Sequence, residues 1–196
     1  MPLLLLALPA LVVQAPAPTV KPVDRVQGLF EAITEAFIEG KRGAMAGLVA
    51  TGKAGWEQAR PDLLKALGEA EAVAIDRQVK AMAKMTPREQ AVGALGVSKA
   101  LSRLQGKSRQ QELRHAHRTA MLAWCLVDSG QLNPLPGVAG AFQPVIDGDK
   151  GSHTLAVMSV QESLKRLQES QQKQQPGGAK KALKDLLKLV DVLEKP

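Results

Sequence analysis

Apolar residues recur every three to four positions along most of this chain, which is the pattern of amphipathic α-helices. The first stripe follows Asp24, which together with Gln27 forms a capping signal, and it predicts a helix over residues 25–39. Gly40 is a natural end for this helix. Four glycines interrupt residues 41–60, where we expect a weak or broken helix.

Three further helices follow from the same pattern. A long apolar stripe predicts a third helix over residues 62–85. Residues 86–89 combine a threonine cap, a proline at the first helical position and a glutamate three residues after the cap, so we expect a fourth helix to Gln105. Ser108 then caps a fifth helix that ends near Gly130, and the fourth and fifth helices should form an antiparallel hairpin.

Residues 130–151 contain three prolines and five glycines without sustained periodicity, which predicts a long loop. A sixth helix over residues 152–167, a glutamine-rich linker over 168–178 and an amphipathic helix over 179–196 complete the chain. The fold class is therefore predicted to be all-α, with an irregular bundle of about six helices plus a C-terminal amphipathic helix, and residues 24–167 forming one domain.

The first 15 residues carry no charge, and their apolar core over residues 3–13 is too short to cross a bilayer, which needs about 20 apolar residues. This is typical of a signal peptide, and residues 16–23 then form a proline-rich tether. We expect an exported protein, periplasmic or extracellular. The alternative is an apolar N-terminus that is kept and packs on the core, because the segment lacks an early Lys or Arg and proline follows both small-residue cleavage patterns.

The composition narrows the choice of partners. The net charge is +7, which favours an anionic partner such as lipid head groups, a wall polymer or nucleic acid, and export would remove nucleic acid from this set. Cys125 is the single cysteine, so no intramolecular disulfide forms, and we interpret it as a buried apolar residue. The basic residues of the predicted hairpin are candidate anion ligands: Arg103, Lys107, Arg109, Arg114 and Arg118.

The sequence contains no arrangement of residues that we recognise as catalytic. His115 and His117 lie two positions apart on a predicted helix, where side chains diverge and cannot hold one ion, and His117 shares the apolar face of that helix. No paired-cysteine or His-Glu-x-x-His spacing is present. We therefore expect no metal and no cofactor, and favour a binding or structural protein over an enzyme.

The segment that begins Asp147-Gly148 and continues through Gly151 to Thr154 resembles the Asp-Gly-x-x-Gly-x-x-Thr turn of peptidoglycan-binding domains. The resemblance covers residues 119–167 at most and implies binding of a wall polymer near this turn. It adds Asp147, Asp149, His153 and Thr154 to the candidate ligand-binding residues. The alternative is an ordinary turn, with the two aspartates as turn formers and Thr154 as a helix cap.

These observations lead to one expectation about function and two alternatives. We expect an exported, non-catalytic helical protein that binds a component of the cell envelope, either anionic or a protein. The first alternative is a module that binds peptidoglycan or an anionic wall polymer. The second is a membrane-surface or virion-associated protein that uses the amphipathic helix of residues 179–196. The sequence leaves the oligomeric state open, and also whether this last helix docks on the rest of the protein.

Overall fold

A computed structural model describes residues 21–132 and 135–194, and within these ranges it contains helices and turns but no strand. The all-α prediction is confirmed. The described part of the chain contains eight α-helices, one more than expected, together with a short 3-10 turn at Arg42–Ala44. The α-helices are α1 (Pro22–Ile38), α2 (Met45–Leu67), α3 (Glu69–Met82), α4 (Pro87–Ser102), α5 (Arg109–Val127), α6 (Leu135–Asp147), α7 (Thr154–Gln172) and α8 (Pro176–Leu193). The predicted signal peptide and most of the proline-rich tether lie outside the described residues.

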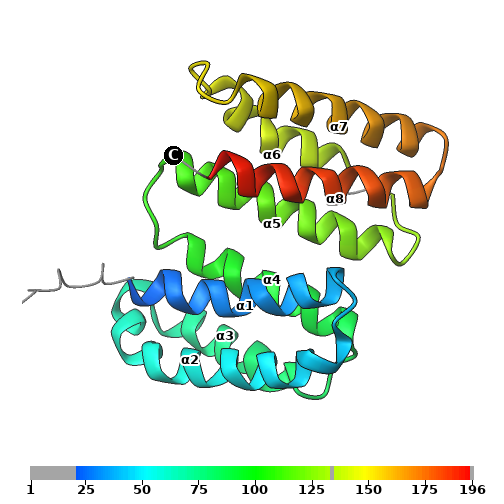
Figure 1. Ribbon diagram of the computed structural model, residues 1–196. Coiled ribbons are helices and arrows are strands. Elements are labelled where there is room, and N and C mark those ends of the chain that lie inside the picture. The colour runs from blue at the N-terminus through cyan, green and yellow to red at the C-terminus, as the bar shows by residue number, and fades with distance from the viewer. Residues whose placement is uncertain (1–20, 133–134, 195–196) are drawn as a thin grey trace, which may run out of the picture.

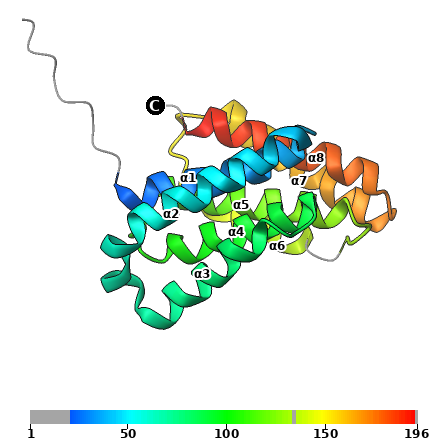
Figure 2. The same cartoon turned by 90° about the horizontal axis from the view of Figure 1, so that it is seen from below.

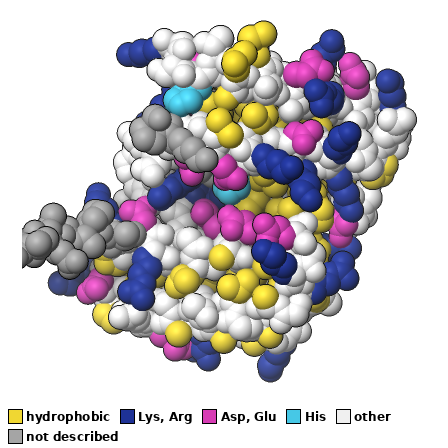
Figure 3. Space-filling view, in the orientation of Figure 1, with side chains coloured by type: hydrophobic (Ala, Val, Ile, Leu, Met, Phe, Trp, Pro, Cys, Tyr) yellow, Lys and Arg dark blue, Asp and Glu magenta, His cyan; other side chains and the backbone are white. Residues whose placement is uncertain are grey.

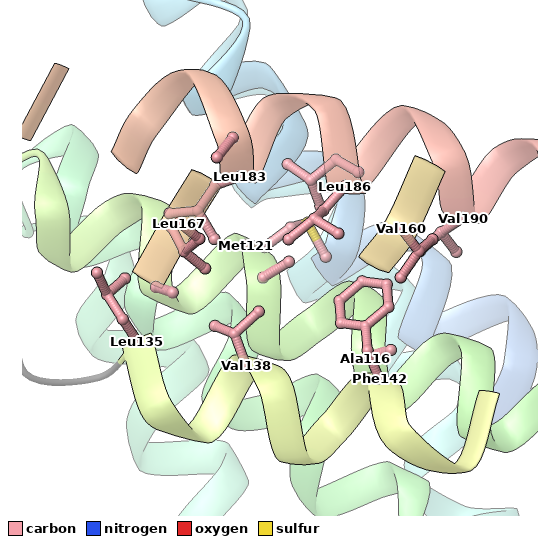
Figure 4. Close-up of a cluster of buried hydrophobic side chains, with 14 of the residues drawn as sticks. Ala116, Met121, Leu135, Val138, Phe142, Val160, Leu167, Leu183, Leu186 and Val190 are labelled. Carbon is pink, nitrogen blue, oxygen red and sulfur yellow. The ribbon is translucent and has the colours of Figure 1, made fainter. Parts of the chain in front are cut away.

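The helices form two groups of four, α1–α4 and α5–α8, which lie one above the other in Figure 1 and are seen from below in Figure 2. Each group surrounds its own cluster of buried side chains. In the α1–α4 group the largest of these are Trp56 and Phe30. Figure 4 shows the other cluster, where Phe142 of α6 and Leu186 of α8 point into a common interior. The core is largely aliphatic, as the scarcity of aromatic residues requires.

Helix α1 starts earlier than expected and without the predicted cap. Pro22 occupies the first turn, where its fixed φ suits the helix, and Lys21 is the N-cap residue without a side-chain hydrogen bond. The carboxylate of Asp24 pairs instead with Arg114 of α5, at 2.6 Å. A tertiary ion pair has therefore replaced the local cap.

Helix α2 was expected to be weak or broken, and this prediction is wrong. The helix runs without interruption through its glycines and through Pro61. The glycines permit close packing on α1, because a Cβ at Gly52 would lie 3.3 Å from Phe30 and a Cβ at Gly55 would lie 2.3 Å from Leu29. Burial against α1 thus outweighs the poor helix propensity of glycine.

The predicted third helix is divided in two. Gly68, with φ of +81°, ends α2 and starts α3, so the apolar stripe of residues 62–85 belongs to two helices. The capping box of Thr86 and Glu89 is confirmed at the start of α4, which ends at Ser102 rather than Gln105. The N-cap of α5 at Ser108 is also confirmed.

The expected pairing of the fourth and fifth helices is minor. Helix α4 packs chiefly on α1, and α5 packs chiefly on α8 and α6. Helix α5 nevertheless touches both groups, because Cys125 lies in the cluster of the α1–α4 group. In the opposite direction, Leu95 of α4 packs in the cluster of the other group.

The predicted long loop over residues 130–151 is wrong, because α6 occupies most of it. Leu135, Val138, Phe142 and Val145 are buried at helical spacing in the cluster that α6 shares with α5, α7 and α8. This stripe was present in the sequence, but the prolines and glycines around it obscured it. Packing of one apolar face therefore holds a helix that contains Pro144.

The glutamine-rich linker is much shorter than predicted. Helix α7 continues to Gln172 and α8 begins at Pro176, so three residues connect the two helices. Glutamine is a good helix former, and Ser170 packs closely enough that a Cβ at Gly178 would lie 2.6 Å from its Oγ. Helix α8 docks with its apolar face buried, including Leu183, Leu186 and Val190. That face is consequently not available to a membrane.

Candidate functional site

The turn between α6 and α7 is fastened to the start of α5 by Arg109. The Arg109 Nη1 donates to the carbonyl of Gly148 at 2.7 Å, and Nη2 lies 3.2 Å from Asp149 Oδ1. Asp149 Oδ2 also accepts the backbone N–H groups of Gly151 and His153, at 3.3 and 3.4 Å. The Asp149 side chain is 5% exposed, so it organises the turn rather than facing a ligand.

The electrostatics of Asp149 agree with this role. Burial of the carboxyl opposes its ionisation, but hydrogen bonds from His153 and Gly151 and the charge of Arg109 lower the pKa of Asp149 below its ordinary value. The Nδ1 atom of His153 lies 3.4 Å from Asp149 Oδ1. Two of the candidate site residues from the turn and one from the basic hairpin are thus brought together.

The remaining turn candidates have local partners. Asp147 accepts a hydrogen bond from Gln143 Nε2 at 2.7 Å. Thr154 is the first residue of α7 rather than its cap, and its hydroxyl donates to the carbonyl of Gly151 at 3.0 Å. His153 occupies the N-cap position of α7. The predicted capping role of Thr154 is therefore wrong.

Most of the basic candidate residues form ion pairs within the protein. Arg118 is 6% exposed and pairs with Glu31 at 3.3 Å, and Arg114 pairs with Asp24. Glu31 also accepts the hydroxyl of Ser98, at 2.7 Å. Burial of Arg118 lowers its pKa, and Glu31 opposes this effect. These arginines join α5 to α1 rather than offering a phosphate site.

The other three basic candidates lie apart from one another. Arg103 lies 2.7 Å from Glu71 of α3, whereas Arg109 is held at the α6–α7 turn. Lys107 is exposed in the connection between α4 and α5. The five basic candidates thus lie at four separate places, and the structure does not assemble them into one anion site.

A groove of about 500 Å³ lies between α6 and α7, which are the two helices joined by this turn. This volume falls within the range of about 300–1,000 Å³ that is usual for ligand sites. The groove has two kinds of lining. Apolar side chains come from Leu135, Ala139, Ile146, Leu164 and Leu167; polar side chains come from Gln143, Gln161, Gln168, Gln171 and Lys165.

The groove offers hydrogen-bonding groups, apolar surface and one positive charge to a polar chain. A glutamine amide donates and accepts hydrogen bonds, while the apolar floor packs against ring faces or aliphatic stems. Lys165 supplies one positive charge for a carboxylate. Gln143 lines the groove and also binds Asp147, so the groove and the turn are physically connected.

Sequence reasoning missed these groove residues because it placed one wall of the groove in a loop. The available signal was the spacing of Leu135, Val138 and Phe142, which marks a buried helical face and so places Ala139 and Gln143 on its border. Gln168 and Gln171 of α7 were assigned to a linker, whereas Gln161, Leu164 and Leu167 lay in the predicted sixth helix. The α6 wall and the end of the α7 wall therefore lay in segments that were not expected to form helices.

Within residues 21–132 and 135–194, no group of three or more His, Cys, Asp or Glu side chains is arranged to hold a metal ion. None of the helices in this part of the chain is both long enough and apolar enough to span a bilayer. Comparisons with protein-family models, with curated proteins and with solved structures found no match.

Proposed function

We propose that the protein is an exported, non-catalytic binding protein of the cell envelope, and that the α6–α7 groove holds a polar wall polymer of the peptidoglycan class. The observation that carries this proposal is the amide-lined groove directly beside the turn of residues 147–154. Peptidoglycan offers hydroxyls, N-acetyl amides and carboxylates, which match the amides and the lysine of this groove. The apolar N-terminal segment would deliver the protein to the compartment that contains this polymer.

Cosedimentation of the purified full chain with isolated sacculi tests the groove. We expect the double variant Gln161→Ala/Gln168→Ala to lose about tenfold or more in affinity, since it removes hydrogen bonds worth about 1 kcal/mol each. Gln58→Ala, on the exposed surface of α2, is the matched control and should bind as the wild type does. Equal binding by the groove variant and the wild type would refute this assignment.

Export is tested separately, by the intact mass and N-terminal peptide of the protein from fractionated native cells. A chain that starts at Pro16 or Pro18 in an exported fraction would support the proposed location. A chain that retains residues 1–15 in the cytosol would exclude it and would restore nucleic acid as a partner to be tested.

A second candidate function is contact with a membrane surface, which the exposed apolar residues at the start of α7 favour. Leu155 is 81% exposed and Met158 is 59% exposed, and Lys150 in the preceding turn is also exposed. Such side chains can enter the interface of an anionic bilayer. Flotation with anionic vesicles should then be lost in Leu155→Ser/Met158→Ser and unchanged in Gln58→Ala; unchanged flotation of the double variant would exclude this contact.

A further inference from the structure

A second hollow lies where the two helical groups meet, between α1, α5 and α8. It consists of two adjoining cavities that share Glu35, His117 and Asp191 as lining residues. We call the one of about 230 Å³, which contains Leu187, the outer cavity, and the one of about 220 Å³, which contains Gln27, the inner cavity. Figure 3 shows acidic side chains in a row across the middle of this face, beside a histidine and below a group of basic side chains. We call this hollow the α1–α8 cleft.

The inner cavity of the cleft has an excess of negative charge. Asp24 is neutralised there by Arg114. Among the described residues, none forms an ion pair with Glu35, Asp191 or Glu194, all of which line this cavity. An acidic cavity of this kind in a chain of net charge +7 attracts cations locally.

The environment of Glu35 in the cleft disfavours its charged form, chiefly through burial. Burial of this carboxyl raises its pKa above the ordinary value, the neighbouring His117 lowers it, and the charges of Glu31, Asp191 and Glu39 raise it further. Burial and neighbouring carboxylates thus both oppose ionisation of Glu35. A bound cation would reverse this effect.

A second observation, independent of charge, indicates that the ligand carries a hydrogen-bond donor. It concerns the side chain of Gln27 in the inner cavity. Gln27 lines the inner cavity and is 1% exposed; its Nε2 donates to the carbonyl of Ser98 at 3.4 Å. Its Oε1 is buried without a hydrogen-bond partner. A buried acceptor without a donor is costly, so a ligand that carries an N–H group and reaches Gln27 would satisfy the site.

The outer cavity can accommodate an apolar part of a ligand whose N–H group lies in the inner cavity. Ile38 of α1, Met121 of α5 and Leu187 of α8 provide apolar surface, and Lys184 and Lys188 line the rim. An alkyl chain can lie along this surface while its charged end reaches the acidic inner cavity. A bare metal ion fits poorly, because the described residues include no suitable group of three metal ligands.

We infer that the α1–α8 cleft binds an aliphatic primary amine, with the ammonium group among Gln27, Glu35 and Asp191 and the alkyl stem along the apolar surface of the outer cavity. Two sources share this chemistry, a free diamine and a lysine side chain on a peptide. The cleft is separate from the α6–α7 groove. Failure of amine binding would therefore not affect the proposal that the groove binds a wall polymer, and the reverse also holds.

Isothermal titration of the full chain tests the inference with 1,5-diaminopentane, the peptide Gly-Lys-Gly, pentan-1-ol, Mg²⁺ and Ca²⁺. We expect binding of at least one amine and none of the alcohol. Glu35→Gln/Asp191→Asn should weaken amine binding by roughly tenfold or more, because it removes the two carboxylates that face the ammonium group. Glu57→Gln/Asp62→Asn makes the same charge change on the exposed surface of α2 and should leave binding unchanged.

Gln27→Leu supplies a second readout, since it removes the unpaired oxygen without removing charge. It should weaken amine binding while the melting temperature stays the same or rises. Diamine binding without peptide binding would identify a free amine as the ligand, and the reverse would identify a lysine side chain. The inference is overturned by absence of binding at millimolar amine, by equal binding in the Glu35/Asp191 variant, or by preference for Mg²⁺ or Ca²⁺.

Discussion

The ring of Phe37 in α1 meets the indole of Trp124 in α5 edge to face, with centroids 5.9 Å apart and planes at 87°. The Nζ atom of Lys180 lies 5.0 Å from the centroid of the same indole. Trp124 packs against both clusters of buried side chains. This aromatic pair therefore joins the two helical groups, at the boundary that also contains the α1–α8 cleft.

We expect Phe37 and Trp124 to be energetically coupled. A double-mutant cycle with Phe37→Leu and Trp124→Leu should give a coupling free energy of about 0.5–1.5 kcal/mol, as edge-to-face pairs do. Urea unfolding measures the free energies. Phe37→Leu combined with Phe142→Leu is the comparison pair, because Phe37 and Phe142 belong to different clusters of buried side chains; its effects should add to within about 0.5 kcal/mol. Simple additivity for Phe37 and Trp124 as well would contradict the proposed coupling.

Arg118 should be needed for folding rather than for binding anions. Arg118→Ala leaves Glu31 partly buried without its charged partner, and we expect a loss of about 3–5 kcal/mol in unfolding free energy. Arg118→Met combined with Glu31→Gln removes both charges and should recover most of this loss. Chemical denaturation provides the measurement. Full stability of Arg118→Ala would show that this ion pair has no structural role.

Asp149 should make the stability of the protein sensitive to acid. Its folded-state pKa is lowered, so its contribution is present above the unfolded-state pKa of about 3.9 and is lost as pH falls through the lower folded value. The difference in unfolding free energy between wild type and Asp149→Asn should be constant from about pH 6 to 8 and shrink in acid. Denaturation at a series of pH values measures this difference, which would remain constant in acid if the ionised carboxylate had no special role.

Cys125 should be inert in the native protein. Burial of its thiol, with a smaller effect from Asp128, raises the pKa of Cys125 to about 12, and the side chain is fully buried. The thiolate fraction at pH 7 is then about 10⁻⁵. A disulfide reagent such as DTNB should react slowly with the native chain and rapidly in urea. Rapid reaction without denaturant would contradict burial of this thiol.

The sequence predicted best those helices whose ends are fixed by neighbouring residues. The reciprocal hydrogen bonds of Thr86 and Glu89 and the cap at Ser108 depend on groups within three positions, so their pattern can be read directly. Local signals of this kind did not predict helices α2 and α6. The glycines and prolines of α2 and α6 oppose helix formation locally. Burial of α2 against α1, and of α6 against α5 and α7, determines the outcome.

The candidate site shows the same division. The basic residues of α5 were identified correctly as a cluster in the sequence, but Arg118 pairs with an acid 87 positions away and Arg114 with one 90 positions away. The groove between α6 and α7 has one wall, that of Gln143, on a helix that was expected to be a loop.

The sequence by itself determined the all-α class, the aliphatic core, the positive charge and the locally capped helices, because each depends on composition or on residues close along the chain. The tertiary structure decided which charged residues form ion pairs, which apolar helix faces are buried, and where the groove and the cleft lie. Those properties depend on groups far apart along the chain, and only packing brings these groups together.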